Sequence, residues 1–400
     1  MGTAALQVLL VDDEPAVVSA LRRMLQLERP GWRIRCTTSG QEASALLDVE
    51  TFDAVVSDIK MPGLDGIQLL ERLRVIQPQA IRIALSGHTD RHELLRSVPT
   101  VHRFLPKPCD SHTLCDTIER ACALTRELED PALRSLVGRL GGLPTLSGPL
   151  QEMLAALDQP DAPTRFCRLL DRAPGITAKL LQLVNSPWFG ARATTRDPRH
   201  AVVLLGTETV RALLLQAHVF DYAQGRLPLG FDLAAQGRHA EAVAGAARLL
   251  ARRARATAIE VELAFTAGVL HDLGKLPLAV GLPAEYQQVM AANTGSLAWR
   301  EERAVFHGTH AAVGACLLGV WGLPGDLVEA VAWHHGQPAS SAQGIGLVTG
   351  LVEYADRLHH RRLAGDSTPV PPDEIPATLR TRLDPLEAHE AIAALFRKAE

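Results

Sequence analysis

The sequence predicts two domains of different fold class: a doubly wound, parallel, five-stranded α/β domain followed by an all-α helical bundle. Five short apolar runs alternate with helix-compatible segments over residues 1–125, as in consecutive βα units of a parallel sheet. Beyond residue 143, apolar residues recur almost everywhere at the spacing of amphipathic helices. Hydrophobic residues make up 47% of the 400 residues and aromatic residues only 4%. This composition favours helices packed through Leu, Ala and Val over a β-sandwich.

Each element of the α/β domain has a local signal in the sequence. Strands are predicted where apolar runs end in polar residues or alternate with them. Pro15 suits the first position of the first helix, and Pro78 stops the third helix. The predicted strands cover residues 6–11, 32–37, 54–58, 81–85 and 102–105, and the predicted helices cover residues 15–25, 40–48, 67–76, 90–97 and 110–124.

Polar side chains follow these strands at the edge where open α/β sheets place their chemistry. Three carboxylates crowded there, Asp12, Asp13 and Asp58, repel one another unless they bind a hard dication, and Mg²⁺ with retained waters is the expected ion. The metal would neutralise the oxygens of an incoming phosphoryl group. Lys107 adds a second positive charge, and the Ser86 hydroxyl can donate to a phosphoryl oxygen. Asp58 is then the expected nucleophile, which forms an acyl phosphate.

The segments LLVDDEP, VVSDIKMPGLDG, IALSG and FLPKP resemble the receiver domain of two-component response regulators, over residues 6–124. The resemblance implies that Asp58 is the phosphoacceptor and that a sensor histidine kinase phosphorylates it. It also implies that Asp12, Asp13 and the Lys60 carbonyl hold Mg²⁺.

The same resemblance implies a switch between two states of the receiver. Ser86 would be the switch hydroxyl, Phe104 the switch aromatic and Lys107 the phosphate-sensing lysine. The family also implies a cis peptide bond between Lys107 and Pro108, which is chemically reasonable because cis peptides are essentially confined to X–Pro bonds.

The helical half contains a second set of side chains that bind metals. Imidazole and carboxylate groups from several helices of one bundle can converge on Fe, Mn or Zn. A dinuclear centre of this kind activates water to attack a phosphate ester, and Lys275 could hold that phosphate. A lone histidine on a helix is usually exposed or a satisfied core group, and this is the interpretation for His359, His360 and His389. The candidate ligands are His239, His271, Asp272, His310, His334, His335 and Asp356.

The segments GVLHDLGKL, THAAVGACLLGVWGLP and AWHH resemble the HD superfamily, and ITAKLLQLVNSPWFG with AVVLLGTETVRALLL resembles its HDOD branch, over residues 131–358. The resemblance implies a signalling module, because HDOD domains are generally without demonstrated phosphohydrolase activity. The seven candidate ligands nevertheless fall where the resemblance to the catalytic HD-GYP branch would place metal ligands.

Two departures from the HD-GYP branch count against catalysis. Its signature after the histidine pair is absent, since residues 336–340 read GQPAS. Ala235 stands one turn before His239, where that branch can supply a glutamate ligand. A shared fold does not by itself give a shared function, so metal binding and catalysis are both open, and a non-enzymatic output is preferred.

The predicted organisation has four parts. The linker is expected to extend the last receiver helix over residues 124–140, with Pro131 as a start or a kink. The tail is expected to form a helix over residues 379–398. The parts are a receiver domain at 1–125, a helical linker at 126–142, an HDOD domain with an HD-type helical bundle at 143–360, and a C-terminal loop and helix at 361–400.

Composition excludes several classes of function. The formal net charge of −4 gives no bulk attraction to nucleic acids, and no helix-turn-helix with a basic recognition helix is found, so no direct DNA binding is expected. No apolar run approaches the roughly 20 residues of a membrane span, and the N-terminus lacks the basic region of a signal peptide. The six cysteines form no CxxC pair. These features predict a cytoplasmic protein that does not associate with membranes.

The predicted function is that of a response regulator in a phosphorelay. Phosphorylated Asp58 changes a receiver face, which alters its contact with the HDOD bundle or with a second copy of the chain as a homodimer. The HDOD domain then engages a protein signalling partner. Two alternatives stay open: a receiver-regulated, metal-dependent phosphohydrolase such as a cyclic-dinucleotide phosphodiesterase, and a phosphorelay intermediate whose HDOD half only scaffolds.

Overall fold

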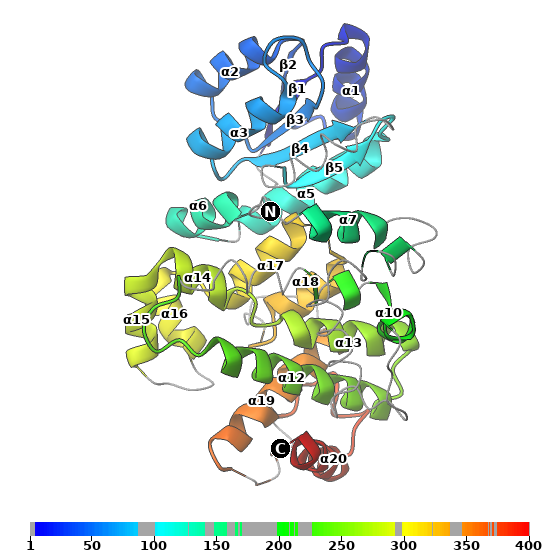
Figure 1. Ribbon diagram of the computed structural model, residues 1–400, viewed down its shortest axis with the longest axis vertical. Coiled ribbons are helices and arrows are strands. Elements are labelled where there is room, and N and C mark those ends of the chain that lie inside the picture. The colour runs from blue at the N-terminus through cyan, green and yellow to red at the C-terminus, as the bar shows by residue number, and fades with distance from the viewer. Residues whose placement is uncertain are drawn as a thin grey trace. The chain divides into compact units, whose positions relative to one another are not determined.

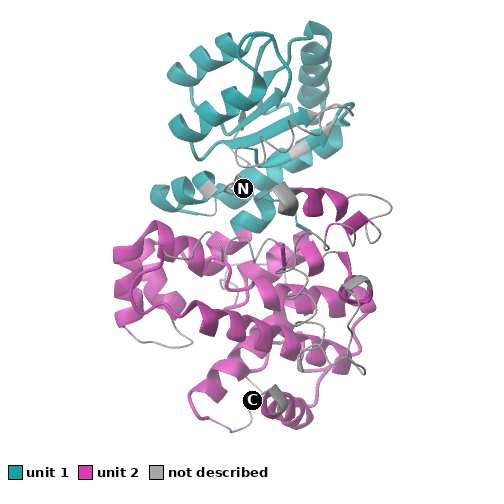
Figure 2. Ribbon diagram, viewed as in Figure 1, with its two compact units in different colours: residues 1–146, 316–323 teal, residues 147–315, 324–400 magenta. Residues whose placement is uncertain are grey.

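The computed structural model divides into two compact units, which are described separately (Figure 2). The first unit contains residues 1–146 and 316–323, and the second contains residues 147–315 and 324–400. The helix predicted at 90–97 and the segment ITAKLLQLVNSPWFG lie outside the described part of the chain. The structure describes residues 5–86, 101–126, 128–140, 148–157, 165–166, 169, 198–207, 209–211, 213–214, 226–292, 298–321, 323–336, 346–366, 368, 370–371 and 374–399.

The first unit is built on a five-stranded sheet (Figure 1). The strand order is β2-β1-β3-β4-β5, and every neighbouring pair is parallel. This is the order of the doubly wound, flavodoxin-like sheet. All five predicted strands are present, and their ends differ from the prediction by at most one residue. The strands are β1 (Gln7–Val11), β2 (Arg33–Thr37), β3 (Ala54–Asp58), β4 (Ile81–Ser86) and β5 (Arg103–Pro106).

Helices cover both faces of this sheet (Figure 1). Helices α2 and α3 pack side by side on one face, and α1 packs with α5 on the other. Strand β3 is therefore buried along its length up to Asp58, whereas the edge strand β2 alternates between exposed and covered residues. Leu9, Val55 and Leu69 belong to the core that α2 and α3 form with the sheet. The helices are α1 (Pro15–Glu28), α2 (Gly40–Val49), α3 (Gly66–Ile76) and α5 (Ser111–Arg126).

Helix α5 and the segment that follows it form two separate helices rather than one extended helix. The chain leaves helical geometry at residues 128–130, and α6 (Pro131–Leu140) begins anew at Pro131. Proline has no backbone N–H and disfavours helix in the residue before it, so it suits the first position of a helix and not its interior. Of the two roles expected for Pro131, it takes that of a start.

A buried arginine attaches α6 to the sheet. Arg82 lies on β4 with no exposed surface. Its Nη2 donates to the carbonyl oxygen of Gly138 in α6 at 2.7 Å, and its Nη1 donates to the carbonyl oxygen of Pro78 at 3.2 Å. Its backbone N–H donates to Nδ1 of His102 at 3.0 Å, next to β5. Burial lowers the pKa of Arg82 to about 9. This one side chain thus joins β4, the start of β5 and α6.

Helices make up the regular structure of the second unit within the described ranges (Figure 1). The alanine-rich helix α12 packs against α13 and α19, and α18 packs against both α13 and α19. The helices are α7 (Gly148–Leu157), α10 (Pro198–Leu205), α12 (Leu233–Arg253), α13 (Ala258–Leu270), α14 (Lys275–Gly281), α15 (Pro283–Ala291), α16 (Ala298–Phe306), α17 (His310–Val320, which belongs to the first unit from residue 316 on), α18 (Gly325–Ala332), α19 (Leu347–Leu363) and α20 (Pro385–Ala399).

The tail helix is shorter than predicted. Helix α20 begins at Pro385, whereas residues 379–382 form turns. The carboxylate of Asp384 accepts hydrogen bonds from the N–H groups of Leu386 at 3.0 Å and Glu387 at 2.9 Å, so it caps the helix. Proline at the first helical position then fixes the start, and the prediction was wrong in passing through it.

One stretch, Ala258–Gly281, has the length and hydropathy of a membrane span. It comprises α13, a turn and α14, and 89% of its most apolar window is buried inside the protein. This is the burial that a core helix has.

The contact between α6 and the loop before β4 can be tested through Gly138. A Cβ at this position would lie 1.9 Å from the carbonyl oxygen of Pro78. Alanine normally stabilises a helix interior by about 0.5–1 kcal/mol relative to glycine. We expect Gly138→Ala instead to cost about 1–3 kcal/mol by overpacking, measured as faster amide hydrogen exchange in α6 of the full-length chain.

Gly31→Ala is the matched control, because a Cβ at Gly31 meets nothing within 4 Å. Equal exchange of the α6 amides in both variants would show that α6 does not depend on this close approach.

Candidate functional site

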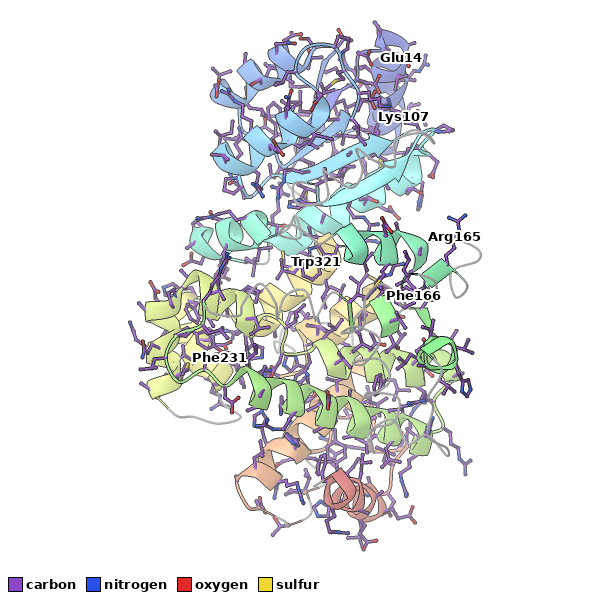
Figure 3. The ribbon with its side chains drawn as sticks, in the orientation of Figure 1. Glu14, Lys107, Arg165, Phe166, Phe231 and Trp321 are labelled. Carbon is purple, nitrogen blue, oxygen red and sulfur yellow. The ribbon has the colours of Figure 1, made fainter. Side chains whose placement is uncertain are left out.

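The first candidate site lies at the C-terminal edge of the sheet in the first unit. Asp58 ends β3 and Asp12 follows the neighbouring strand β1. The ammonium of Lys107, which follows β5, lies 2.6 Å from Oδ2 of Asp12 and 3.0 Å from Oδ2 of Asp58. The N–H of Glu14 donates to Oδ1 of Asp12 at 3.0 Å, so Glu14 and Lys107 contact the same carboxylate. Figure 3 labels Glu14 and Lys107 in the first unit. The strand order therefore gathers these groups from three separate strand ends.

The charges at this edge are coupled. Burial raises the pKa of Asp58, while the hydrogen bond from Lys107 opposes that rise. Burial alone would lower the pKa of Lys107, but its contacts with Asp12 and Asp58 raise it above the ordinary value. Lys107 therefore stays cationic and lets two carboxylates sit close together. An arriving phosphoryl group would find the same cation.

Local backbone geometry holds Asp58 in place. Its Oδ1 accepts from the N–H of Ile59 at 2.8 Å. A Cβ on Gly66 would lie 1.8 Å from the carbonyl oxygen of Asp58, so only glycine fits at the start of α3. Asp65 caps that helix, and Gln68 completes a capping box with it. The turn after β3 is thus fixed by the residues that follow it.

The other residues predicted for this site are placed only in part. Ligand oxygens of Asp12, Asp13 and Asp58 lie within 4.8 Å of one another, which fits a hard dication with oxygen ligands such as Mg²⁺. Lys60 follows directly in the loop after β3 and is exposed. Ser86 ends β4 and Phe104 lies in β5, but both side chains fall outside the described part of the structure. The bond between Lys107 and Pro108 is cis, as the resemblance implied.

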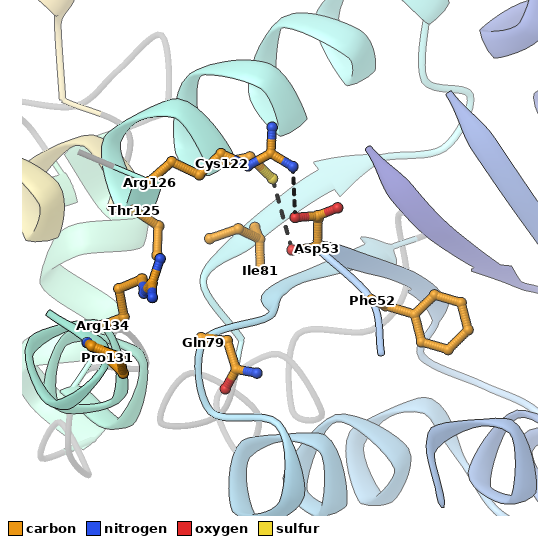
Figure 4. Close-up of a pocket in the computed structure, with 9 residues that line it drawn as sticks. All are labelled: Phe52, Asp53, Gln79, Ile81, Cys122, Thr125, Arg126, Pro131 and Arg134. Carbon is orange, nitrogen blue, oxygen red and sulfur yellow. Dashed lines mark hydrogen bonds and ion pairs between the residues drawn. The ribbon is translucent and has the colours of Figure 1, made fainter. Parts of the chain in front are cut away.

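A cavity of about 380 Å³ lies at the opposite edge of the same sheet (Figure 4). Asp53, directly before β3, contributes to its wall and pairs with Arg126 at 2.9 Å. Since Asp58 is at the other end of this strand, the cavity is separate from the carboxylate site. It is lined by Phe52, Asp53, Gln79, Ile81, Cys122, Thr125, Arg126, Pro131 and Arg134.

The second candidate site is a cluster of histidines and aspartates in the second unit. The structure brings together all seven residues that the sequence suggested as ligands. Five different helices or their ends supply them, so only the tertiary fold makes the cluster. His239 lies in α12, His271 and Asp272 follow α13, His310 begins α17, His334 and His335 follow α18, and Asp356 lies in α19.

Four buried histidines share one orientation. Each uses Nδ1 for a contact on one side and presents Nε2 to the other histidines. Nε2 atoms lie 3.1 Å apart in the pair His239–His271 and 3.3 Å apart in the pair His310–His334, and Nε2 of His335 lies 3.0 Å from that of His310. Metal-bound histidines are typically anchored in this way through their other ring nitrogen. The Nδ1 partners are Nδ1 of His359 for His239 at 2.8 Å, the Gly268 oxygen for His271 at 2.8 Å, Glu302 for His310 at 2.6 Å and the Val331 oxygen for His334 at 2.7 Å.

Asp272 divides the cluster into two halves. Its Oδ1 lies 3.0 Å from Nε2 of His310 and 3.9 Å from Nε2 of His334. Its Oδ2 lies 3.4 Å from Nε2 of His239 and 3.5 Å from Nε2 of His271. Each half gathers ligand atoms within 4.8 Å of one another. A carboxylate placed in this way can bridge two metal positions.

Lys275 and Gln236 both contact the carboxylate of Asp272. Lys275 Nζ lies 2.6 Å from Oδ2 and Gln236 Nε2 lies 2.8 Å from it. Burial would raise the pKa of Asp272, but Lys275 and the histidines keep it well below its usual value. Lys275, suggested by the sequence as a phosphate contact, therefore binds a carboxylate here.

Burial and neighbouring charges together set the protonation of the histidines that face Asp272. It lowers the pKa of His334 to about 3, and His271 and His310 act in the same direction. For His310, burial is outweighed by Glu302 and Asp272, which raise the pKa to about 9. His334 is thus neutral at pH 7, which is the form that binds metals. His310 lies between the carboxylates of Glu302 and Asp272, so a positive charge at this position is favourable. A bound metal ion can supply that charge in place of the proton on His310.

Four residues of the cluster were missed by reasoning from the sequence. The structure corrects the interpretation of His359 and His360 as isolated histidines: His359 contacts His239, and Nε2 of His360 lies 3.3 Å from Oδ1 of Asp356. The spacing of four residues between Asp356 and His360 on one helix was a usable signal. Glu302 and Gln236 gave no such signal, because they join the cluster only through the packing of α16 and α12.

Family comparisons cover both units. Residues 8–119 match the response regulator receiver domain, and residues 143–337 match the HDOD domain. The fold and its sites therefore define a signalling protein that joins a receiver to a helical output domain. Its N-terminal domain is a response regulator receiver domain, and its C-terminal domain is an HDOD domain.

The curated relatives match over limited lengths. The hydrogenase transcriptional regulatory protein HoxA of Cupriavidus necator is 35% identical over 116 residues, which are 28% of this chain and 23% of HoxA. The sensory/regulatory protein RpfC of Xanthomonas campestris is 31% identical over 134 residues, which are 32% of this chain and 18% of RpfC. The matched part is less than a quarter of each relative's length.

Two solved structures resemble the chain over about two thirds of its length. A Shewanella amazonensis protein, provisionally described as a phosphohydrolase, is 25% identical with a TM-score of 0.50 and covers 68% of this chain and 100% of its own. A Marinobacter aquaeolei protein, provisionally described as a signal transduction protein, is 20% identical with a TM-score of 0.51 and covers 69% of this chain and 64% of its own. The second likeness shows the fold alone.

Glu302 offers a test of the metal centre that leaves every ligand in place. It is fully buried and orients His310. We expect Glu302→Gln to weaken Mn²⁺ or Zn²⁺ binding by about 10–100-fold, because it removes the charge behind a ligand. Competition titration of the full-length chain, with excess Mg²⁺ to fill the receiver, measures this. Glu301→Gln on the same helix is the control, and equal affinities in the two variants would contradict the role of Glu302.

Proposed function

We propose that this protein is a response regulator in which phosphorylation of Asp58 by a sensor histidine kinase controls the HDOD domain. The observation that carries this proposal is the arrangement of Asp58, Asp12 and Lys107 at one sheet edge, with Lys107 in contact with both carboxylates. A carboxylate that is partly buried, 14% exposed, and paired with a cation can act as a nucleophile that solvent still reaches.

The proposed reaction is transfer of a phosphoryl group from a phosphohistidine to Asp58. An oxygen of the Asp58 carboxylate forms a bond to phosphorus while the bond between phosphorus and the imidazole nitrogen breaks, and the kinase histidine keeps the released electron pair. Asp12, Asp13, Asp58 and the Lys60 carbonyl would hold Mg²⁺, which neutralises charge on the phosphoryl oxygens. Lys107 would then contact the phosphoryl group and lose its contact with Asp12.

The proposed switch involves one residue of β4 and one residue of β5, the two strands that follow β3 in the sheet. Ser86 at the end of β4 would donate to a phosphoryl oxygen, and Phe104 in β5 would respond to that movement. Ligands of this kind bias a two-state element rather than deform a packed core. The receiver face formed by the helix predicted after Ser86, β5 and α5 would then change its contact with a protein partner or a second copy of the chain, and the HDOD domain would carry the signal onward.

Regulated phosphohydrolase activity is the second candidate function, and one observation favours it. All seven histidines and aspartates of the cluster are present and converge around Asp272. A bound Fe, Mn or Zn pair would activate water toward a phosphate ester. Against this candidate, Ala235 stands where the HD-GYP branch can supply a glutamate ligand, and a phosphate could contact Lys275 only by drawing it away from Asp272. We therefore expect a metal centre in a signalling domain rather than an enzyme.

The phosphoacceptor assignment predicts a clear phenotype. Asp58→Asn should abolish labelling by radioactive acetyl phosphate with Mg²⁺, because an amide oxygen is a poor nucleophile. Asp53→Asn makes the same change at the other end of β3 and should leave labelling unchanged. Labelling that persists in Asp58→Asn at the wild-type level would refute the assignment.

The output assignment makes a separate prediction. The full-length chain, loaded with Mn²⁺ or Fe²⁺, should bind metal but should not hydrolyse cyclic dinucleotides, with or without acetyl phosphate. The measurement is product formation by chromatography, with the double variant His271→Ala/Asp272→Ala as the metal-free reference. Hydrolysis by the wild type that this variant lacks would establish the phosphohydrolase in place of the signalling module.

A further inference from the structure

The half of the cluster formed by α12 and α19 contains more ligand atoms than the sequence suggested. His239, Asp356 and His360, here called the α12–α19 triad, place one ligand atom each within 4.8 Å of one another. Nε2 of His239 lies 3.1 Å from Oδ1 of Asp356, and Nε2 of His360 lies 3.3 Å from the same oxygen. The rings of His239 and His360 are 4.8 Å apart between centroids.

The central oxygen of this triad is buried without a hydrogen bond. Oδ1 of Asp356 has no aligned donor, although ring nitrogens of His239, His360 and His271 lie 3.1, 3.3 and 3.7 Å away. An unsatisfied buried carboxylate oxygen is costly. The three ring nitrogens lie close to this oxygen, but none of them donates a hydrogen bond to it. Ligand atoms that share one bound cation are arranged in the same way.

His271 also belongs to this half of the cluster, and His360 adds a further nitrogen to it. Oδ2 of Asp272, which faces His239, already accepts hydrogen bonds from Lys275 and Gln236. Ala235, one turn before His239, has no donor atom in its side chain. His360 sits one turn after Asp356 and adds an imidazole on the same side of α19.

We propose that the α12–α19 triad is a second metal position, with His360 as a ligand, next to the position formed by Asp272, His310, His334 and His335. The proposal rests on the metal centre described above and adds a ligand to it. Two imidazoles with one carboxylate form the donor set of non-haem Fe(II) sites, which keep positions open for a further ligand.

Solvent reaches the triad through His360. The side chain of His360 is 21% exposed, against 15% for His335, 10% for His239, 1% for His310 and 0% for His334. The open positions therefore take a small anion or a diatomic molecule from solvent. The two halves differ in donor set, so they are two unlike ion positions.

Anaerobic titration of the metal-stripped, full-length chain with Fe²⁺ tests the proposal, with excess Mg²⁺ present to occupy the receiver. Wild type should bind two Fe²⁺ ions, and His360→Gln should lose one of them, with at least about 100-fold weaker binding. His112→Gln is the control, because His112 is a 78% exposed histidine of the receiver. His334→Ala should lose the other ion and keep the one in the triad.

Nitric oxide reports on the open positions. The electron paramagnetic resonance signal of an iron–nitrosyl should appear in wild type and in His334→Ala and should be absent from His360→Gln. Near-ultraviolet circular dichroism of the metal-free chains checks the fold. If His360→Gln is misfolded, the variant His360→Asn replaces it: loss of the nitrosyl signal in that variant but not in His334→Ala supports the triad, and persistence of the signal overturns the role of His360.

The outcomes separate three failures. Wild type that binds no transition metal overturns the whole metal centre, the triad included. Wild type that binds two ions, with neither the second ion nor the nitrosyl signal affected by His360→Gln, overturns the role of His360 and leaves the centre standing. A single ion that is insensitive to His360→Gln overturns the second position.

Discussion

Both sites depend on the same constraint: each contains a buried carboxylate that needs a lysine beside it as counter-charge. In the receiver, Lys107 lies 2.6 Å from Asp12, which is almost fully buried, and in the HDOD domain Lys275 lies 2.6 Å from Asp272, which is equally covered. A charged carboxylate cannot be removed from water unless a cation or several donors replace the water. The lysine makes each site stable before any ligand arrives, and it is also the group that a ligand must displace or move.

The two sites apply this constraint with different chemistry. The receiver offers carboxylate oxygens on the ends of parallel strands, which suits a hard ion and a phosphoryl group that come and go. The HDOD cluster offers mostly imidazole nitrogens anchored from behind by Glu302, backbone oxygens and His359. Such nitrogen-rich sets favour transition metals that stay bound. A site suited to a transient phosphoryl group and a site suited to a resident metal ion thus occur in one chain.

Much of the fold could be predicted from the sequence because the signals are local. Apolar runs marked the five strands to within one residue, and Asp58 could be placed at a strand end from the run before it. The seven suggested ligands were found because each sits at a recognisable helix end or in an apolar helix. Glu302 and Gln236 could not be found, since their role depends on how α16 and α12 pack. Pro131 and Pro385 were the local signals that deserved more weight, because each starts a helix.

The attachment of α6 by Arg82 has a practical consequence for where this chain can be cut. Residues 8–119 match the receiver family, yet the guanidinium of Arg82 donates to the carbonyl oxygen of Gly138, well beyond that match. A fragment that stops at α5 would leave a cation inside the sheet without this acceptor and would expose the loop that Gly138 covers. A stable receiver fragment would therefore extend through Leu140 rather than end at residue 119.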